Sequence, residues 1–105
     1  MIDFWAPWCK PCVEFEPDYS ALAKILHSRP NNMIRLSSYD VTKDKDNKDT
    51  VVRYKITTFP ALLFFINGIP IQYEGNRKIE HLLQWMKQIL DAPQPLELRT
   101  IEDIN

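Results

Sequence analysis

Length, composition and charge are those of a small globular domain. The chain has 105 residues, of which 45% are hydrophobic and 26% charged, so we expect one domain with a modest core. The formal net charge of −1 argues against nucleic acids or anionic membranes as partners attracted by bulk charge. No apolar run approaches the ~20 residues of a membrane span, and no basic segment followed by an apolar stretch marks a signal peptide.

The first half of the chain predicts a strand, a helix and a second strand. Residues 2–6 are short, apolar and aromatic, as in a buried strand. A helix is predicted from Cys9 towards Leu26, because apolar residues recur there at helical spacing, and Pro17 predicts a kink in it. Residues 33–39 predict the second strand, and the charged segment that follows, residues 40–49, predicts a solvated loop.

The second half predicts a short helix, a β-hairpin and a final helix. Residues 50–54 suit the short helix, and the continuously apolar residues 61–66 predict a central strand buried on both faces. Asn67-Gly68 is a strong two-residue hairpin signal, after which residues 69–74 return antiparallel. An apolar stripe over residues 79–90 predicts the last helix.

This order of elements predicts an α/β fold with a mixed sheet of about four strands and helices on both faces. A strand-helix-strand crossover gives a parallel pair, and the hairpin adds antiparallel strands. We expect residues 1–90 to form the domain. Residues 91–105 resemble a proline-containing linker and the possible start of a following domain.

The two cysteines of the chain, Cys9 and Cys12, stand two residues apart among tryptophans and prolines. A disulfide closing so short a loop restricts the unfolded chain little, so the pair is predicted to do chemistry rather than to stabilise the fold. Two thiols at positions i and i+3 of a helix share one face and can close a disulfide. The helix N-terminus favours the thiolate of Cys9, which would attack a substrate disulfide, and Cys12 would resolve the mixed disulfide. The positive charge of Lys10 should also favour the thiolate of Cys9, whereas the negative charges of Glu14 and Glu16 oppose it.

Three other interpretations of the cysteine pair compete with redox catalysis. A closed zinc site needs four ligands, and the two histidines, His27 and His81, have a spacing that matches no zinc finger. Haem attachment needs histidine directly after the second cysteine, where Val13 stands. A buried, inert pair would not usually lie between two prolines and two tryptophans. We therefore predict redox catalysis, with no metal and no cofactor other than the Cys9–Cys12 disulfide itself.

The stretch WAPWCKPC at residues 5–12 resembles the active site of the thioredoxin superfamily, and its flanks resemble a catalytic, a-type domain of the protein disulfide isomerase family. The resemblance covers residues 2–90 and implies a thioredoxin-like fold, with the strand and helix that precede the active-site strand in the family apparently absent. Further matching positions are a helix-kinking proline, a cis-proline loop and two glycine turns: Pro17, Phe59, Pro60, Gly68 and Gly75.

The resemblance also implies roles for individual residues. Asp3 stands where the family keeps a buried acid, which implies a proton acceptor for the thiol of Cys12. Arg77 is implied to modulate Cys12 by moving towards it. The peptide bond before Pro60 is implied to be cis, although only ~5–6% of X–Pro bonds in folded proteins are cis. The implied substrate-binding surface surrounds the cysteines and consists of Trp8, Lys10, Pro11, Phe59 and Pro60.

Two departures from the family pattern concern the redox balance of the pair. Ser38 stands where many isomerase domains carry a lysine that pairs with the buried acid, and Arg35 has the wrong strand parity to replace it. Lys10-Pro11 replaces the Gly-His pair that isomerases often have between the cysteines, and a proline there is more thioredoxin-like.

The expected function is that of a thiol-disulfide oxidoreductase or isomerase that forms, reduces or reshuffles disulfides. The alternatives are a thioredoxin-type reductant of specific clients and a structural thioredoxin-like module of a larger complex. The expected partners are cysteine-containing protein substrates and a redox partner such as glutathione, an oxidase or a reductase. The resemblance implies that the chain is part of a longer multidomain protein in the lumen of the endoplasmic reticulum, although no retention signal is visible.

Overall fold

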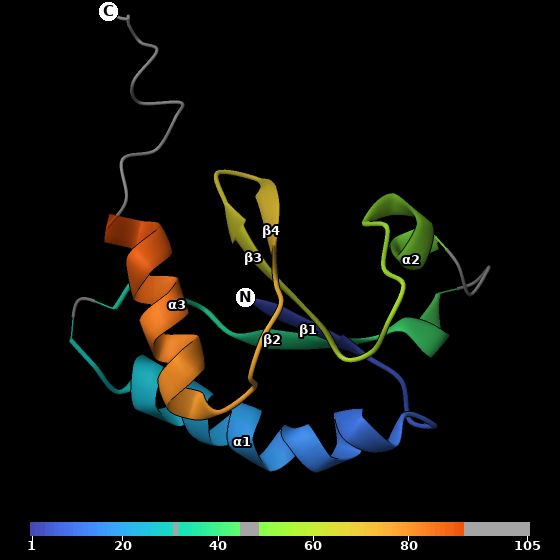
Figure 1. The fold of residues 1–105 in the computed structure, drawn as a ribbon, viewed down its shortest axis with the longest axis horizontal. Helices are drawn as coiled ribbons and strands as arrows, with labels where there is room; N and C mark the ends of the chain where they lie inside the picture. The colour runs from blue at the N-terminus through green and yellow to red at the C-terminus, as the bar shows by residue number, and fades with distance from the viewer. Residues whose placement is uncertain (31, 45–48, 92–105) are drawn as a thin grey trace, which may run out of the picture. The chain divides into compact units, whose positions relative to one another are not determined.

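A computed structural model describes residues 1–30, 32–44 and 49–91 of the chain (Figure 1). It contains two compact units, Met1–Gly75 and the residues from Asn76 onward, and each is described by itself. The first unit holds strands β1 (Ile2–Trp5), β2 (Ser37–Asp40), β3 (Ala61–Ile66) and β4 (Ile69–Tyr73), helices α1 (Lys10–His27) and α2 (Asp49–Arg53), and a 3₁₀ turn (Val41–Lys43). In the described part of the second unit lies helix α3 (Ile79–Asp91).

The four strands form one mixed sheet in the order β2-β1-β3-β4. β1 runs parallel to β2 and antiparallel to β3, and β3 pairs antiparallel with β4. The turn between β3 and β4 is the predicted hairpin, because Asn67 and Gly68 both have positive φ, at 52° and 80°. The sheet order confirms the predicted α/β fold with a four-stranded mixed sheet.

The side chains of β1 alternate between the two faces of the sheet. Phe4 points towards α2, where its ring lies 6.2 Å from the ring of Tyr39 and 5.7 Å from that of Tyr54. Asp3 and Trp5 point the other way and line a cavity together with residues of α1. Helices α1 and α2 therefore cover opposite faces, as the sequence predicted.

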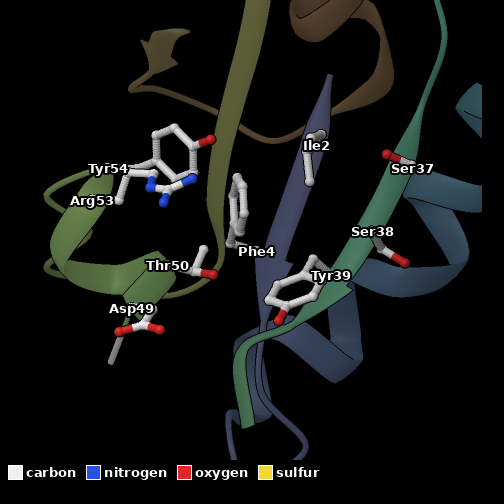
Figure 2. Close-up of a pocket in the computed structure, with 9 residues that line it drawn as sticks. All are labelled: Ile2, Phe4, Ser37, Ser38, Tyr39, Asp49, Thr50, Arg53 and Tyr54. Atoms are coloured by element: carbon white, nitrogen blue, oxygen red, sulfur yellow. The ribbon is translucent and has the colours of Figure 1, made fainter. Parts of the chain in front are cut away.

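On the α2 face, a pocket of about 360 Å³ lies between α2 and the two strands β1 and β2 (Figure 2). Ile2 and Phe4 line it from β1, and Figure 2 shows the side chains of Thr50, Arg53 and Tyr54 across from them. This pocket lies on the sheet face opposite to Asp3, so it is separate from the cavity on the α1 face.

Helix α1 is held by one apolar stripe and one buried hydroxyl. Its buried residues, Phe15, Tyr19, Leu22 and Leu26, follow the predicted helical spacing. Pro17 lies inside the helix without ending it. The hydroxyl of Tyr19 donates to the carbonyl oxygens of Met1 at 3.0 Å and Ser37 at 2.8 Å, so it links α1 to the region where β1 and β2 begin.

The prediction of a second strand over residues 33–39 was wrong at its start. β2 begins at Ser37, because the four residues of β1 pair with Ser37–Asp40 and no farther back. Before it, the side-chain amide of Asn32 accepts a hydrogen bond from the N–H of Ile34 and donates one to its carbonyl oxygen. These bonds occupy the backbone groups that a strand would use.

The described part of the charged segment that we expected to be a solvated loop contains a short turn and side-chain hydrogen bonds. It begins with the 3₁₀ turn, and the carboxylate of Asp44 accepts hydrogen bonds from the hydroxyl of Tyr39 and from the backbone N–H and hydroxyl of Thr50. The other short elements agree with expectation: α2 starts one residue early, and β3 spans the predicted residues. Of the predicted linker and following domain, residues 91–105, Asp91 is the last residue of α3 and residues 92–105 lie outside the described residues, so the extent of the domain stays a prediction. None of the helices described here is both long and apolar enough to cross a bilayer.

The Tyr19 bridge predicts a specific loss of stability at alkaline pH. Burial raises the pKa of Tyr19 well above its ordinary value of 10. The contribution of its protonated hydroxyl is fully present below pH 10 and is lost as the pH rises further, because the unfolded tyrosine then ionises while the folded one does not. Tyr19→Phe should lower the free energy of unfolding by about 1–3 kcal/mol at pH 7, because two carbonyl groups lose their partner.

Urea unfolding at pH 7 and at pH 11 measures both effects. The difference between wild type and Tyr19→Phe should shrink at pH 11, whereas the matched control Tyr54→Phe should keep the alkaline loss of the wild type. An equal alkaline loss in Tyr19→Phe and the wild type would contradict this assignment.

Candidate active site

Cys9 is the N-cap residue of α1. Its backbone is extended (φ −90°, ψ 106°), and its Sγ accepts a hydrogen bond from the backbone N–H of Cys12 at 3.2 Å. The turn before it is closed by a bond of 3.0 Å from the Cys9 N–H to the carbonyl oxygen of Ala6. A sulfur in this position receives an otherwise unpaired N–H and the positive end of the helix dipole, and both favour the thiolate once the disulfide is reduced.

Cys9 and Cys12 form a disulfide in this structure, with Cα atoms 5.3 Å apart. Both residues are buried, with exposed fractions of 5% for Cys9 and 2% for Cys12. They belong to a core cluster whose other members are Phe4, Ala6, Val41, Ile56, Ala61 and Leu63. The two residues between them, Lys10 and Pro11, are exposed, so the dithiol is held by the core while the first residues of α1 between the two sulfurs face solvent.

An apolar rim adjoins the disulfide. The side chain of Trp8, directly before Cys9, is 70% exposed. Its ring meets that of Phe59 edge to face, with ring centroids 5.5 Å apart and an interplanar angle of 89°. Phe59 packs against the cluster that contains both cysteines. The peptide bond between Phe59 and Pro60 is cis, which confirms the expected geometry of this loop.

On the other side of Cys12, Asp3 is buried in the middle of the sheet. Its exposed fraction is 3%, which rules out an edge-strand aspartate in water. In the parallel pair of β1 and β2, its partner is Ser38, the residue at the position where the resemblance implies a lysine in many isomerase domains. Asp3, Ser38 and Cys12 all line one cavity of about 530 Å³ on the α1 face. The carboxyl group therefore lines the same cavity as Cys12.

The structure brings together most of the predicted site residues but not all. Arg77 lies in the second unit, so its predicted role stays a prediction. The sequence reasoning missed Glu16, which lines the same cavity as Cys12. The spacing i, i+4 from Cys12 could have revealed it, since such residues share a helix face. Within the described residues, no group of three or more potential ligands could hold a metal ion, and His27 instead accepts a hydrogen bond from the N–H of Leu36.

Comparison with known proteins agrees with this geometry. The sequence model of the family described as Thioredoxin matches residues 1–88. The chain therefore belongs to the thioredoxin family. Relatives include protein disulfide isomerase-like 1-4 of Oryza sativa subsp. japonica, 36% identical over 98% of this chain, and protein disulfide-isomerase A4 of Bos taurus, 36% identical over 84% of it.

Solved structures share the fold. The first thioredoxin domain of mouse protein disulfide-isomerase A4 superposes with a TM-score of 0.71, at 22% identity, over 90% of this chain and 66% of that one. Human ERp44 superposes with a TM-score of 0.74, at 23% identity, over 88% of this chain and 27% of that one. The chain spans 17% and 14% of the full lengths of the rice and bovine relatives, so it corresponds to one domain of such proteins.

The exposure of Trp8 predicts that this ring contributes little to folding. Trp8→Ala should change the free energy of unfolding by less than about 0.5 kcal/mol, because most of the ring already contacts water. Phe4→Ala, which empties a buried position in the core cluster that contains both cysteines, should cost roughly 3–5 kcal/mol. Urea unfolding of the two variants and the wild type tests the contrast, and a loss of stability in Trp8→Ala comparable with that in Phe4→Ala would contradict it.

Proposed function

We propose that this domain is a thiol-disulfide oxidoreductase of the protein disulfide isomerase type. The observation that carries the proposal is the position of Cys9 at the N-cap of α1, where its sulfur accepts the N–H of Cys12 and is bonded to the sulfur of Cys12. Family membership and the disulfide isomerase relatives support the same class of reaction.

The reduction of a substrate disulfide proceeds in two exchanges. The thiolate of Cys9 attacks one sulfur of the substrate, a mixed disulfide forms, and the other substrate sulfur leaves as a thiolate that takes a proton from solvent. Cys12 then loses its proton and attacks the sulfur of Cys9, which releases the second substrate thiolate and closes the Cys9–Cys12 disulfide. The reverse sequence oxidises a substrate dithiol, and the same intermediate allows disulfides to be reshuffled.

Asp3 is the proposed proton acceptor for Cys12 in the second exchange. Its burial and its place on the cavity that Cys12 also lines support this role. A carboxylate in an enclosed space can take the thiol proton without separating charge into water, which is the requirement for general base catalysis. Arg77 remains a proposed modulator of the same step.

The proposed substrates are cysteine-containing protein chains that the domain contacts loosely. The exposed ring of Trp8 and the adjoining ring of Phe59 offer apolar contact area beside the disulfide, without a deep pocket of fixed shape. Lys10, Pro11 and Pro60 complete the proposed contact surface. We place the domain in a multidomain protein of the endoplasmic reticulum lumen, with glutathione, an oxidase or a reductase as its redox partner.

A second candidate function is that of a thioredoxin-type reductant for specific clients. The Lys10-Pro11 pair between the cysteines favours it. The reduction potentials of the two kinds of protein differ by ~90 mV, from about −270 mV for thioredoxin to about −180 mV for disulfide isomerase. This difference corresponds to roughly 4 kcal/mol. Titration with glutathione redox buffers distinguishes the two candidates.

The proposed chemistry predicts different behaviour for the two cysteine variants. Cys9→Ser should abolish the reduction of insulin disulfides, because the attacking sulfur is gone. Cys12→Ser should accumulate a mixed disulfide with the substrate, because nothing resolves it. Insulin turnover and mass spectrometry of the trapped species provide the measurements. Unchanged turnover in Cys9→Ser, with stoichiometric co-purification of a partner chain, would instead identify a structural module.

The role of Asp3 predicts a pH-dependent defect in the resolving step. Asp3→Asn should slow the release of substrate thiol from the Cys9 mixed disulfide by roughly 10²-fold at pH 7, the lower range for loss of a general base. Raising the pH should narrow the difference in rate between Asp3→Asn and the wild type, because Cys12 then loses its proton to solvent without the help of Asp3. Stopped-flow measurements of thiol release between pH 6 and pH 10 test this prediction, and parallel pH profiles with equal rates would exclude the role.

A further inference from the structure

The cavity beside Cys12 reaches from the buried carboxyl group to the surface of the domain. Asp3 and Cys12, both buried, form its inner part. Glu16 and Pro17 of α1 also line it, and both are exposed to solvent. At about 530 Å³ and with several polar side chains on its wall, the cavity has room for more than one water molecule.

Glu16 stands at the border between this cavity and bulk water. It follows Cys12 by four residues in α1, so the two side chains share one face of the helix. The hydroxyl of Ser20, one helical turn further on, donates to Oε2 of Glu16 at 2.6 Å. Ser20 lines the same cavity, so this bond joins two side chains of its wall.

The other polar groups on the wall are poor proton carriers. The hydroxyl of Tyr19 donates to the carbonyl oxygens of Met1 and Ser37, and burial raises its pKa, so it keeps its proton at neutral pH. The hydroxyls of Ser37 and Ser38 are neutral and do not ionise in this range. Among the described residues that line the cavity, the titratable groups are thus Asp3, Cys12, Tyr19 and Glu16.

We propose that Glu16 is the proton exit of the active site, carrying to solvent the proton that Asp3 takes from Cys12. This inference rests on the proposed function and deepens it. In the resolving step the S–H bond of Cys12 breaks, its proton moves to the carboxylate of Asp3, and the new thiolate displaces the substrate thiolate from Cys9. Asp3 then returns to its ionised form by passing the proton through cavity water to Glu16, which releases it. During substrate oxidation the proton follows the same route inward.

The proposed role and simple electrostatic repulsion predict opposite changes in rate when the charge of Glu16 is removed. A carboxylate near Cys12 and Asp3 disfavours a second negative charge there, so its neutralisation would by itself speed the formation of the Cys12 thiolate. Loss of a proton exit has the opposite effect, because Asp3 must then exchange its proton without help. The sign of the change in rate therefore separates the two explanations.

The experiment compares Glu16→Gln with Glu14→Gln in the full chain. The glutamine side chain of the first variant would keep the shape and the acceptor oxygen for Ser20. Glu14, which is exposed and does not line the cavity, is the matched control for charge. Release of substrate thiol is followed over repeated turnovers at pH 7 in dilute buffer, in H₂O and in D₂O, because Asp3 must return its proton to solvent before it can accept the next one. We expect Glu16→Gln to be about 5-fold slower than the wild type, a modest part of the ~10²–10⁴ that general acid–base catalysis contributes.

Two further readouts exclude a merely structural effect. The solvent isotope effect should increase in Glu16→Gln alone, because the transfer of the proton from Asp3 to solvent then limits turnover. Added imidazole, which is small enough to enter the cavity, should restore the rate in proportion to its concentration, and Glu14→Gln should show neither the larger isotope effect nor the rescue by imidazole.

The outcomes separate the relay from the function on which it depends. If the wild type resolves the mixed disulfide normally while the two glutamate variants have equal rates, the relay is overturned and the oxidoreductase function stands. Faster release in Glu16→Gln also overturns the relay, in favour of electrostatic repulsion. If the wild type releases no substrate thiol, the proposed function fails, and the relay fails with it.

Discussion

The chemistry of this domain depends on one hydrogen bond, from the backbone N–H of Cys12 to the sulfur of Cys9. The first turn of a helix leaves N–H groups without helical partners, and a side-chain oxygen commonly accepts one of them. Here the acceptor is a sulfur that can carry negative charge. The bond persists only if α1 is fixed against the sheet, so the buried stripe of that helix and the Tyr19 bridge support the redox site as much as they support the fold.

Successive side chains of the central strand β1 point to opposite faces of the sheet, so a core residue and a candidate site residue stand next to each other in the sequence. Phe4 packs on the α2 face in the cluster that also holds both cysteines. Asp3, one residue earlier, faces the α1 side, where the cavity gives it a path to solvent. A strand buried on both faces would ordinarily carry apolar residues throughout. Burial of the carboxyl group therefore costs folding free energy, and the proposed role of Asp3 as a proton acceptor gives a reason for keeping it there.

Much of the fold could be predicted because its signals are local. Continuous apolar residues predicted β3, the Asn67-Gly68 pair predicted the hairpin, and the helical spacing of apolar residues predicted α1. The start of β2 could not be predicted in this way. Residues before Ser37 are compatible with a strand, but pairing with the short β1 and the side-chain bonds of Asn32 decide where the strand begins.

The sequence by itself determined the dithiol and its helix, because the two-residue spacing, the prolines and the helical periodicity are properties of neighbouring residues. The burial of Asp3, its pairing with Ser38 and its sharing of a cavity with Cys12 and Glu16 were decided by the tertiary structure. These relations join residues from β1, α1 and β2, and they exist only once the sheet register and the packing of α1 are set. Local sequence can place a carboxyl group on a strand, but packing decides whether it lies in water or beside a reactive sulfur.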